Sequence, residues 1–185
     1  MAKVYIFLAD GYEEIEGLTV VDLLRRANIE IIMVSLTGDI YVTGSHAITT
    51  KADMLFDDVN FTDADMLVLP GGLPGTNHLK AHEGLDLLLR EFHAKGKKLA
   101  AICAAPSVLG TKGLLKGKNA TCYPGHEDSL FGANIINNGV VEDGNIVTSK
   151  GLGTAIDFSL SLIKIIAGEA EAVKIARAIQ YPNYK

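Results

Sequence analysis

Short apolar runs alternate with helix-like segments along most of the chain, and this alternation restricts the fold more than any other feature. Val4–Leu8 and Ile29–Leu36 are apolar runs of strand length, and the segment Glu13–Ala27 between them has the character of a helix that ends in two arginines. Apolar runs of this length are typical of strands buried on both faces of a parallel sheet. The pattern therefore predicts an α/β fold, a sandwich of helices on a mostly parallel central sheet.

The same alternation continues in the middle of the chain. Met66–Leu69 and Leu99–Ile102 are further short buried strands, and the first of them stops at the strong turn signal Pro70-Gly71-Gly72. Leu85, Leu88, Leu89 and Phe92 follow helical spacing, with Gly96 as the predicted C-cap.

Two hairpins and two helices complete the predicted elements. One hairpin covers Ile40–Lys51 at a sheet edge, and the other pairs Val140–Val141 with Ile146–Val147 around the turn signature Asp143-Gly144. Helices are expected over Thr154–Ala167, with a capping-box-like start, and over Glu169–Ile179. Because there is no repeat, low-complexity tract or long linker, we expect a single domain over residues 1–185.

Composition and charge limit which binding partners and which cellular compartment we expect. The 185 residues carry a net charge of −5 without a Lys/Arg-rich block, so we expect neither strong nucleic-acid binding nor binding to an anionic membrane. The apolar run within Met1–Asp10 is too short for a signal peptide and reads as a first strand of a cytoplasmic protein. The two cysteines, Cys103 and Cys122, make no disulfide framework and are expected to stay reduced.

Cys103 stands where a buried strand gives way to a helix. Small residues, a proline and a helical apolar spacing follow it directly. This pattern predicts a sharp strand-to-helix turn with the sulfur near the helix N-terminus, where unpaired N–H groups favour the thiolate. In a parallel α/β sheet, ligands bind beyond the carboxyl ends of the strands. The acidic segment Asp10–Glu16, the turn at 70–72 and Cys103 should therefore converge.

These residues can support nucleophilic catalysis. Backbone N–H groups at Gly71 and Gly72 can stabilise an oxyanion, and the carboxyls of residues 13, 14 and 16 are the acid/base groups at a strand end. A carboxyl beside the sulfur in an apolar pocket has a raised pKa and can hold a proton. Structural alternatives remain: a lone cysteine often serves as a small buried hydrophobe, and a Glu-rich helix start is favoured by the helix dipole alone. The turn position favours a reactive Cys103.

Four segments resemble motifs of the ThiJ/PfpI superfamily, in order, with similar spacing and over nearly the whole chain. They are Ala9–Glu16 (ADGYEEIE), Val68–Gly72 (VLPGG), Ala100–Pro106 (AAICAAP) and Thr148–Thr154 (TSKGLGT). Within it, the chain is most similar to the parkinsonism-associated deglycase branch and its bacterial ThiJ-like relatives. The resemblance implies a flavodoxin-like three-layer sandwich and a homodimer. It also implies a nucleophile-elbow cysteine and a protonated carboxylic acid touching its sulfur, with backbone donors completing an oxyanion pocket. The residues at these positions are Cys103, Glu16 and, as donors, Gly71, Gly72 and Ala104.

The resemblance also implies a function. Members of this branch are credited with converting methylglyoxal or glyoxal to hydroxy acids without glutathione, as glyoxalase III-like enzymes, and with repairing early glycation adducts. Others are described as oxidative-stress sensors or redox-regulated chaperones that use the same cysteine. We therefore expect a small dicarbonyl substrate and catalysis by Cys103 and Glu16, with a sensor or chaperone as the alternative. No metal or organic cofactor is implied.

Several positions depart from the patterns of the superfamily. The eukaryotic branch has a histidine where this chain has Tyr123, and a family arginine near the dimer interface aligns roughly with His46. Tyrosine is a poor proton shuttle at neutral pH, so Glu16 is expected to carry the acid/base work nearly alone. Ala104 replaces the histidine that follows the cysteine in PfpI-type peptidases, and no histidine follows His126, so peptidase and glutamine amidotransferase activities are not expected.

The remaining candidates favour structural interpretations. His78 and His82 have the i, i+4 spacing of helical zinc ligands, but their context predicts a solvated helix face. Cys122 is expected to be a buried thiol, and the run from His126 to Asp128 a polar loop. The pair Arg25-Arg26 is expected to end a helix, and the resemblance adds a role at a subunit interface.

Overall fold

The computed structural model describes residues 2–182, which form a central sheet with helices on both faces. The strands are β1 (Lys3–Leu8), β2 (Glu30–Ser35), β3 (Tyr41–Thr43), β4 (Thr49–Lys51), β5 (Met54–Leu55), β6 (Met66–Leu69), β7 (Lys98–Ile102), β8 (Asn119–Ala120), β9 (Asn134–Ile135), β10 (Val140–Asp143) and β11 (Ile146–Ser149). The α-helices are α1 (Glu14–Arg26), α2 (Gly75–Ala81), α3 (Glu83–Ala94), α4 (Pro106–Thr111), α5 (Ala155–Ala167) and α6 (Glu169–Ala178). Short 3-10 helices cover Phe56–Asp58, Phe61–Asp63, Glu127–Ser129 and Leu152–Thr154.

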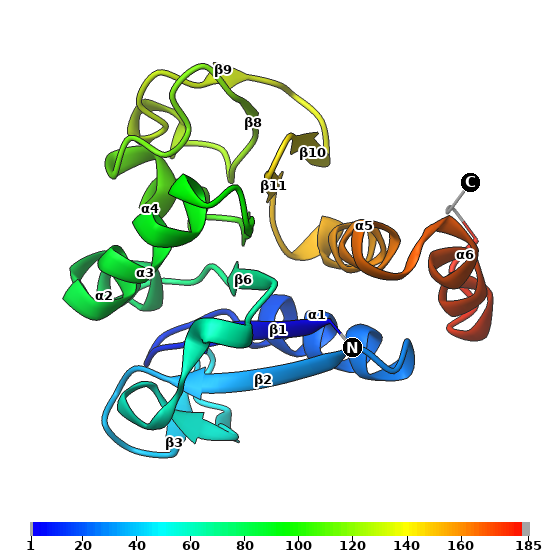
Figure 1. Ribbon diagram of the computed structural model, residues 1–185, viewed down its shortest axis with the longest axis horizontal. Coiled ribbons are helices and arrows are strands. Elements are labelled where there is room, and N and C mark those ends of the chain that lie inside the picture. Colours follow the sequence, from blue (N-terminus) through cyan, green and yellow to red (C-terminus); the bar gives the residue numbers. More distant parts are fainter. Residues whose placement is uncertain (1, 183–185) are drawn as a thin grey trace.

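The central sheet is mostly parallel, as the alternation predicts. Its strand order is β10-β11-β7-β6-β1-β2-β5, and only β10 and β11 pair antiparallel. Helices α2, α3 and α4 gather on one side of the strands, and α5 and α6 lie on the other side (Figure 1). The predicted flavodoxin-like three-layer sandwich is thus confirmed.

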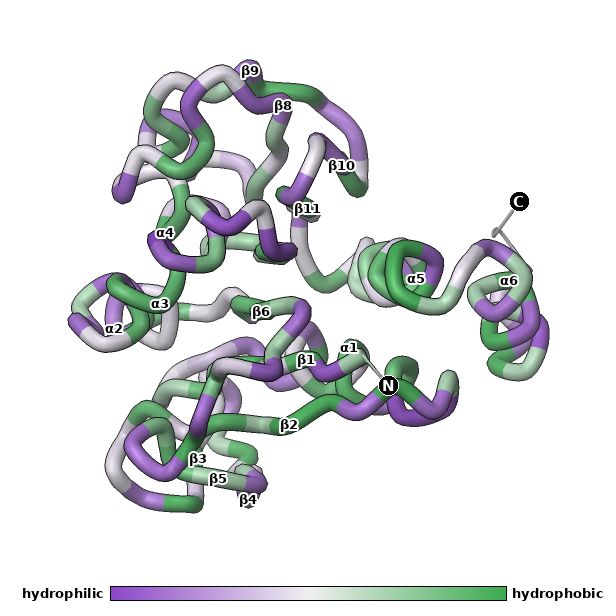
Figure 2. Tube along the Cα trace, in the orientation of Figure 1, coloured by the Kyte–Doolittle hydropathy of each residue, from purple (hydrophilic) through white to green (hydrophobic). Residues whose placement is uncertain are grey.

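Two hydrophobic cores lie on the two faces of this sheet. Along β1, Val4, Ile6 and Leu8 belong to the core shared with α1, α5 and α6, whereas Tyr5 and Phe7 belong to the core shared with α3 and α4. Successive side chains of a strand point to opposite faces, so a strand that is apolar at every position is buried on both. Strands β2 and β6 and helix α5 are correspondingly hydrophobic along most of their length (Figure 2).

The hairpins form where the sequence predicts them, with one difference in placement. β10 and β11 pair antiparallel, with Asp143 opposite Ile146, and β3 and β4 pair antiparallel, with Val42 opposite Thr50. The β3–β4 hairpin, however, makes its own two-stranded sheet beside the edge, while the short strand β5 occupies the edge next to β2. The hairpin contacts the segment between β1 and α1, where the Gly11 N–H donates to the Thr43 carbonyl at 2.8 Å.

Helix ends differ from the prediction in two details. Lys95 is the C-cap of α3, and Gly96 follows it with a φ of +66°, the left-handed position that glycine commonly fills after a helix. The expected capping box of α5 is wrong: the Thr154 hydroxyl lies 2.7 Å from the Ser149 hydroxyl and donates to the Gly151 carbonyl, so it caps no N–H of α5. Among the described residues, none of the helices has the length and hydrophobicity needed to cross a membrane.

Candidate active site

Three adjacent parallel strands bring the candidate residues together. β7, β6 and β1 are neighbours in the sheet, and the chain leaves their carboxyl ends at Cys103, at Pro70-Gly71 and at Ala9. The first turn of α1, which carries Glu16, lies at the same end. The convergence predicted from the sequence is present.

Cys103 lies on a sharp turn between β7 and α4. Its φ is +65°, in the left-handed region that a side chain other than glycine rarely occupies. Two hydrogen bonds hold the turn: the Cys103 N–H donates to the Ser149 carbonyl at 2.9 Å, and its carbonyl accepts from the Tyr123 N–H at 2.8 Å. Non-glycine residues in this conformation cluster at functional sites, and the strained strand-to-helix turn is the arrangement of a nucleophile elbow.

Glu16 is buried beneath the sulfur. Glu16 is 1% exposed, and its Oε2 accepts a hydrogen bond from the Gly71 N–H at 3.0 Å. The carboxyl also hydrogen-bonds the Cys103 side chain and accepts from the Leu152 N–H. The carboxyl is therefore fixed against the sulfur from β6 and from the segment after β11.

Gly71 fits this position because it has no side chain. A Cβ there would lie 2.5 Å from the Cys103 Cβ and 2.6 Å from Glu16 Oε2, well inside van der Waals contact. Gly72 has a φ of +88°, and a Cβ would lie 2.3 Å from the Glu13 backbone nitrogen. Gly71 allows the turn after β6 to pack directly on Cys103 and Glu16, and Gly72 allows it to pack on the backbone that precedes α1.

The backbone donors expected around the sulfur divide into two kinds. The N–H groups of Gly72 and Ala104 hydrogen-bond the Cys103 sulfur. The Gly71 N–H, in contrast, donates to Glu16. In this arrangement Gly71 holds the carboxyl in place, whereas Gly72 and Ala104 hold the sulfur.

Burial raises the pKa of both side chains. Burial raises the pKa of Glu16 from 4.5 to about 7, against the lowering effect of its hydrogen bonds to Cys103 and Gly71. Burial and the negative charge of Glu16 raise the pKa of the Cys103 thiol to about 12, and the backbone donors at Gly72 and Ala104 offset this only in part. The thiol pKa is thus raised, opposite to the lowering expected from the helix start. Burial is the larger cause and acts whether or not Glu16 carries a proton.

A pocket of about 270 Å³ opens onto this pair. Glu13, Glu16, Cys103, Tyr123 and His126 line it, together with Gly72, Leu73, Ala104 and Leu152. Tyr123 is 52% exposed, and its ring meets the His126 ring edge-on with centroids 6.4 Å apart. His126 thus lies in the same pocket as the sulfur, which the sequence alone did not indicate.

Gly151 is a site residue that sequence reasoning did not single out. A Cβ on Gly151 would lie 3.7 Å from Glu16 Oε1 and 3.8 Å from the Cys103 sulfur. The position is part of the Thr148–Thr154 segment quoted for the resemblance, and the run of glycines there is the signal that could have identified it.

The remaining candidates have structural roles. His82 caps α3 by accepting from the Leu85 N–H at 3.0 Å and packs on Phe56, so it does not lie on a solvated helix face; His78 is exposed, and its Nδ1 lies 2.9 Å from the Asp10 carbonyl. Cys122 is a buried free thiol, as expected. It packs in the core of α3 and α4, whereas Cys103 packs against the opposite core.

Known proteins resemble this chain in both sequence and fold. Protein DJ-1 homolog B of Arabidopsis thaliana is 38% identical over 94% of this chain, which spans only 40% of that longer protein. The deglycase PfpI of Pyrococcus furiosus is 31% identical over 89% of this chain and 99% of its own length. Oxidised DJ-1 of Toxoplasma gondii superposes with a TM-score of 0.95 and 36% identity, over 98% of this chain and 100% of that one.

The sequence profile of the DJ-1/PfpI family matches residues 2–165. This match covers β1 through most of α5, and it includes the strand ends that carry Cys103, Glu16 and the glycines of the β6 turn. The chain belongs to the DJ-1/PfpI family.

Proposed function

We propose that this protein is a cysteine-dependent enzyme that converts small reactive dicarbonyls, such as methylglyoxal and glyoxal, to hydroxy acids without glutathione or another cofactor. The observation that carries the proposal is the hydrogen-bonded pair of Cys103 and Glu16 at the base of a small pocket. Relatives named deglycases, among them PfpI of Pyrococcus furiosus, support chemistry on carbonyl compounds.

The first step joins the substrate to the enzyme. Cys103 attacks the aldehyde carbon while its thiol proton passes to Glu16, whose pKa near 7 suits a general base at neutral pH. The N–H groups of Gly72 and Ala104 stabilise the oxyanion that develops on the carbonyl oxygen. Glu16 then returns the proton to this oxygen, and the product is a neutral hemithioacetal.

The second step is an internal redox rearrangement. Glu16 removes the proton from the former aldehyde carbon and passes it to the neighbouring carbonyl oxygen, and an enediol forms. Glu16 then moves the hydroxyl proton of the former aldehyde carbon to the neighbouring carbon, which gives a thioester: the former aldehyde carbon is oxidised and the neighbouring carbon is reduced. Water hydrolyses the thioester and releases lactate from methylglyoxal or glycolate from glyoxal. Because the net reaction only adds water, it needs no external oxidant or reductant.

Deglycation of early adducts uses the same pair. An adduct of an amine with the aldehyde releases the amine when the carbon–nitrogen bond breaks, and Cys103 then captures the freed aldehyde carbon as above. The pocket of about 270 Å³ is open to solvent, so the adduct can remain attached to a larger molecule.

Product analysis by NMR tests the proposal. The purified protein, free of glutathione, is incubated with methylglyoxal or glyoxal, and lactate or glycolate is expected to appear only in its presence. If neither product forms above the uncatalysed rate, the proposed activity is refuted.

A redox sensor or redox-regulated chaperone is the second candidate. The observation that favours it is that Cys103 is partly exposed whereas Cys122 is buried, so an oxidant reaches one thiol selectively. The N–H groups of Gly72 and Ala104 are in position to bind the oxygens of an oxidised sulfur. This candidate predicts that oxidation of Cys103 changes dimer stability or partner binding.

We propose that the protein works as a cytoplasmic homodimer with one catalytic domain per subunit. An apolar hollow of about 600 Å³ between α1 and the end of α6 supports a second copy as partner. Ile15, which is 50% exposed, lines it, as does Arg26, which forms an ion pair with Asp22 at 2.7 Å. Light scattering after size exclusion measures the mass in solution, and a monomer at all concentrations would contradict the proposed dimer.

A further inference from the structure

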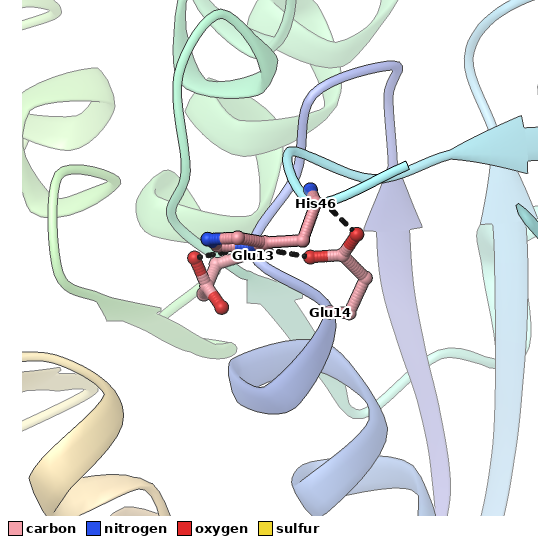
Figure 3. Close-up of side chains that lie close together, drawn as sticks. All are labelled: Glu13, Glu14 and His46. Atoms are coloured by element: carbon pink, nitrogen blue, oxygen red, sulfur yellow. Dashed lines mark hydrogen bonds and ion pairs between the residues drawn. The ribbon is translucent and has the colours of Figure 1, made fainter. Parts of the chain in front are cut away.

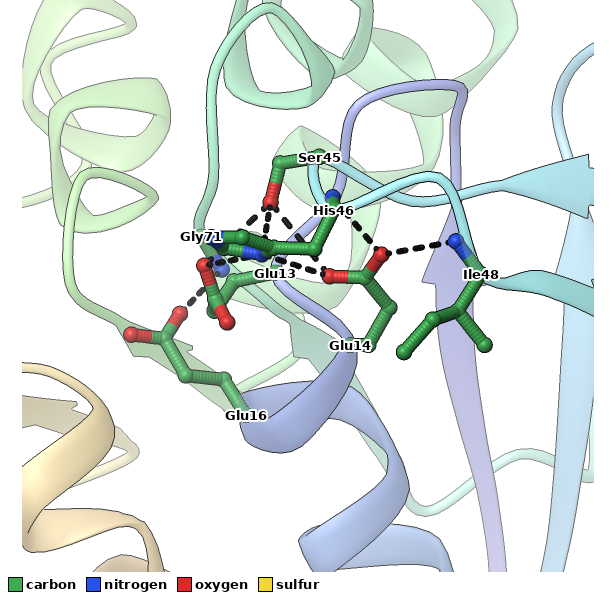
Figure 4. A network of polar contacts seen from close by, with 7 residues as sticks. All are labelled: Glu13, Glu14, Glu16, Ser45, His46, Ile48 and Gly71. Carbon is green, nitrogen blue, oxygen red and sulfur yellow. Dashed lines mark hydrogen bonds and ion pairs between the residues drawn. The ribbon is translucent and has the colours of Figure 1, made fainter.

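The turn of the β3–β4 hairpin lies directly across the start of α1. The Ser45 N–H donates to the Tyr12 carbonyl at 2.8 Å, and a Cβ on Gly44 would lie 2.2 Å from the Glu14 carboxyl carbon. The turn therefore packs on Glu14 and brings Ser45 and His46 against the two glutamates that begin the helix. Figure 3 shows the side chains of Glu13, Glu14 and His46 pointing toward one another, and Figure 4 adds Ser45.

Four potential ligand atoms meet at this contact. The Ser45 Oγ lies 3.2 Å from Glu13 Oε2, 3.4 Å from Glu14 Oε2 and 3.0 Å from His46 Nδ1. The His46 Nδ1 lies 3.0 Å from Glu14 Oε2 and 3.6 Å from Glu13 Oε2. The ligand atoms of Glu13, Glu14 and His46 all lie within 4.8 Å of one another.

These separations have the dimensions of a tetrahedral coordination shell. Zinc binds histidine nitrogen and carboxylate oxygen at about 2.0–2.2 Å, and a tetrahedron of that radius has edges of roughly 3.3–3.6 Å. Five of the six separations among these atoms, 3.0 to 3.6 Å, lie close to this range, and the sixth, between the two glutamates, is within 4.8 Å. An ion can therefore enter the centre with only small displacements of the side chains.

We propose that Glu13, Glu14, Ser45 and His46 bind a divalent transition-metal cation of the zinc class. The two carboxylates balance the charge of the cation, and the imidazole nitrogen supplies the ligand type that distinguishes zinc-class sites from those for magnesium or calcium. The Ser45 hydroxyl supplies the fourth oxygen.

The site is held in place before an ion arrives. The Glu14 side chain is 2% exposed, and its Oε1 accepts from the backbone N–H groups of His46 at 2.8 Å and Ile48 at 3.3 Å. These bonds fix the carboxylate and leave Oε2 for the metal. Although burial opposes ionisation, the hydrogen bonds from the backbone and from His46 lower the pKa of Glu14 to about 2, so the ligand is charged.

Access is from the solvent side. The His46 side chain is 65% exposed, whereas that of Glu13 is 15% exposed and also lines the pocket of Cys103. Glu16 points away from the cluster toward Gly71 (Figure 4). The proposed metal site is therefore a neighbour of the candidate active site and shares one wall with it, but it uses none of the reacting groups.

Direct metal binding tests the proposal independently of any enzymatic activity. The full-length protein is dialysed against Zn²⁺ at pH 8, where protons compete least for His46, and bound metal is measured by mass spectrometry. About one zinc ion per chain is expected, with at least about tenfold weaker binding in His46→Arg and in Glu13→Gln. Arginine retains a cation beside the two carboxylates but offers no ligand atom, so this variant separates metal binding from charge balance.

Two controls and a spectrum make the outcomes decisive. Cys103→Ala removes the nearby thiol and His78→Gln removes an exposed histidine elsewhere; both should bind zinc as the unchanged protein does. Co²⁺ should give the intense visible absorption of a four-coordinate site. The proposal is overturned by an absence of saturable binding, by loss of binding in Cys103→Ala, by unchanged binding in His46→Arg and Glu13→Gln, or by a six-coordinate cobalt spectrum.

Discussion

The Gly71 N–H donates a hydrogen bond to Glu16 Oε2 at 3.0 Å, and this contact joins the end of β6 to the first turn of α1. The same glycine faces the Cys103 Cβ, which would lie 2.5 Å from a Cβ at position 71. One backbone position thus sets the distance between the sulfur and its carboxyl partner. The candidate chemistry depends on this spacing as much as on the two side chains.

A methyl group at Gly71 should therefore impair catalysis. Gly71→Ala forces Cys103 and Glu16 apart, and a displacement of about 1 Å at reacting groups can lower activity about 100-fold. Overpacking should also reduce the free energy of unfolding by about 1–3 kcal/mol. Gly153→Ala is the matched control, because a Cβ there meets no atom within 4 Å. Kinetics and urea unfolding of both variants measure the effects, and equal activity of the two would contradict the spacing argument.

Glu16→Gln should remove the general base while keeping the shape of the side chain. We expect turnover of methylglyoxal to fall about 10²–10⁴-fold, the range typical of a lost general base. In the unchanged protein, kcat/KM should rise with pH through about 7, because the Glu16 carboxylate is the form that accepts the thiol proton. Glu83→Gln, an exposed change on α3, should leave the rate and its pH profile as they are. A flat profile in the unchanged protein would exclude Glu16 as the base.

The raised pKa of Glu16 also predicts how stability depends on pH. The folded protein holds the Glu16 proton up to about pH 7, whereas the unfolded chain releases it near 4.5, so the folded state binds more protons between these values. The contribution of Glu16 to stability is complete below about pH 4.5 and is lost as pH rises through about 7; its size is about 3 kcal/mol.

Urea unfolding at several pH values measures this contribution. As pH rises from 4.5 to 7, the free energy of unfolding of the unchanged protein should fall relative to that of Glu16→Gln. A difference that stays constant over this window would show that Glu16 titrates normally.

Much of the fold follows from local sequence patterns. The strands β1, β2, β6 and β7 lie within one residue of the predicted ranges, because a strand buried on both faces is apolar at every position. Helix α1 begins one residue after its predicted start and ends at Arg26. The very short β5, β8 and β9 were not predicted, because two residues are too few to show a period.

The site was predictable only in part. Cys103 and the glycines can be predicted from their positions at strand ends. The hydrogen bond from the Gly71 N–H to Glu16 cannot, because it depends on packing between β6 and α1. The raised pKa of the thiol comes from burial and from the Glu16 charge, neither of which a sequence pattern measures. His46 lies 32 residues from Glu14, and only the fold of the hairpin across α1 brings the two together.

Oxidation should distinguish the two thiols. Under graded peroxide, Cys103 is expected to be oxidised before Cys122, because Cys103 is partly exposed and Cys122 is 4% exposed. Intact-mass and peptide mass spectrometry locate the added oxygen. The control variant Cys122→Ser should gain the same mass as the unchanged protein. If Cys122 is oxidised first, or if Cys103 stays reduced, the redox-sensor candidate loses its basis.

The rate of lactate release from methylglyoxal in the absence of glutathione, compared between the unchanged protein and Cys103→Ser, tests the central claim most directly. Serine keeps the size of the side chain and its place on the turn but lacks the nucleophilic sulfur. We predict turnover by the unchanged protein and a loss of at least about 10³-fold in Cys103→Ser, with circular dichroism unchanged. Comparable lactate release by the two proteins would contradict the assignment of Cys103 as the nucleophile.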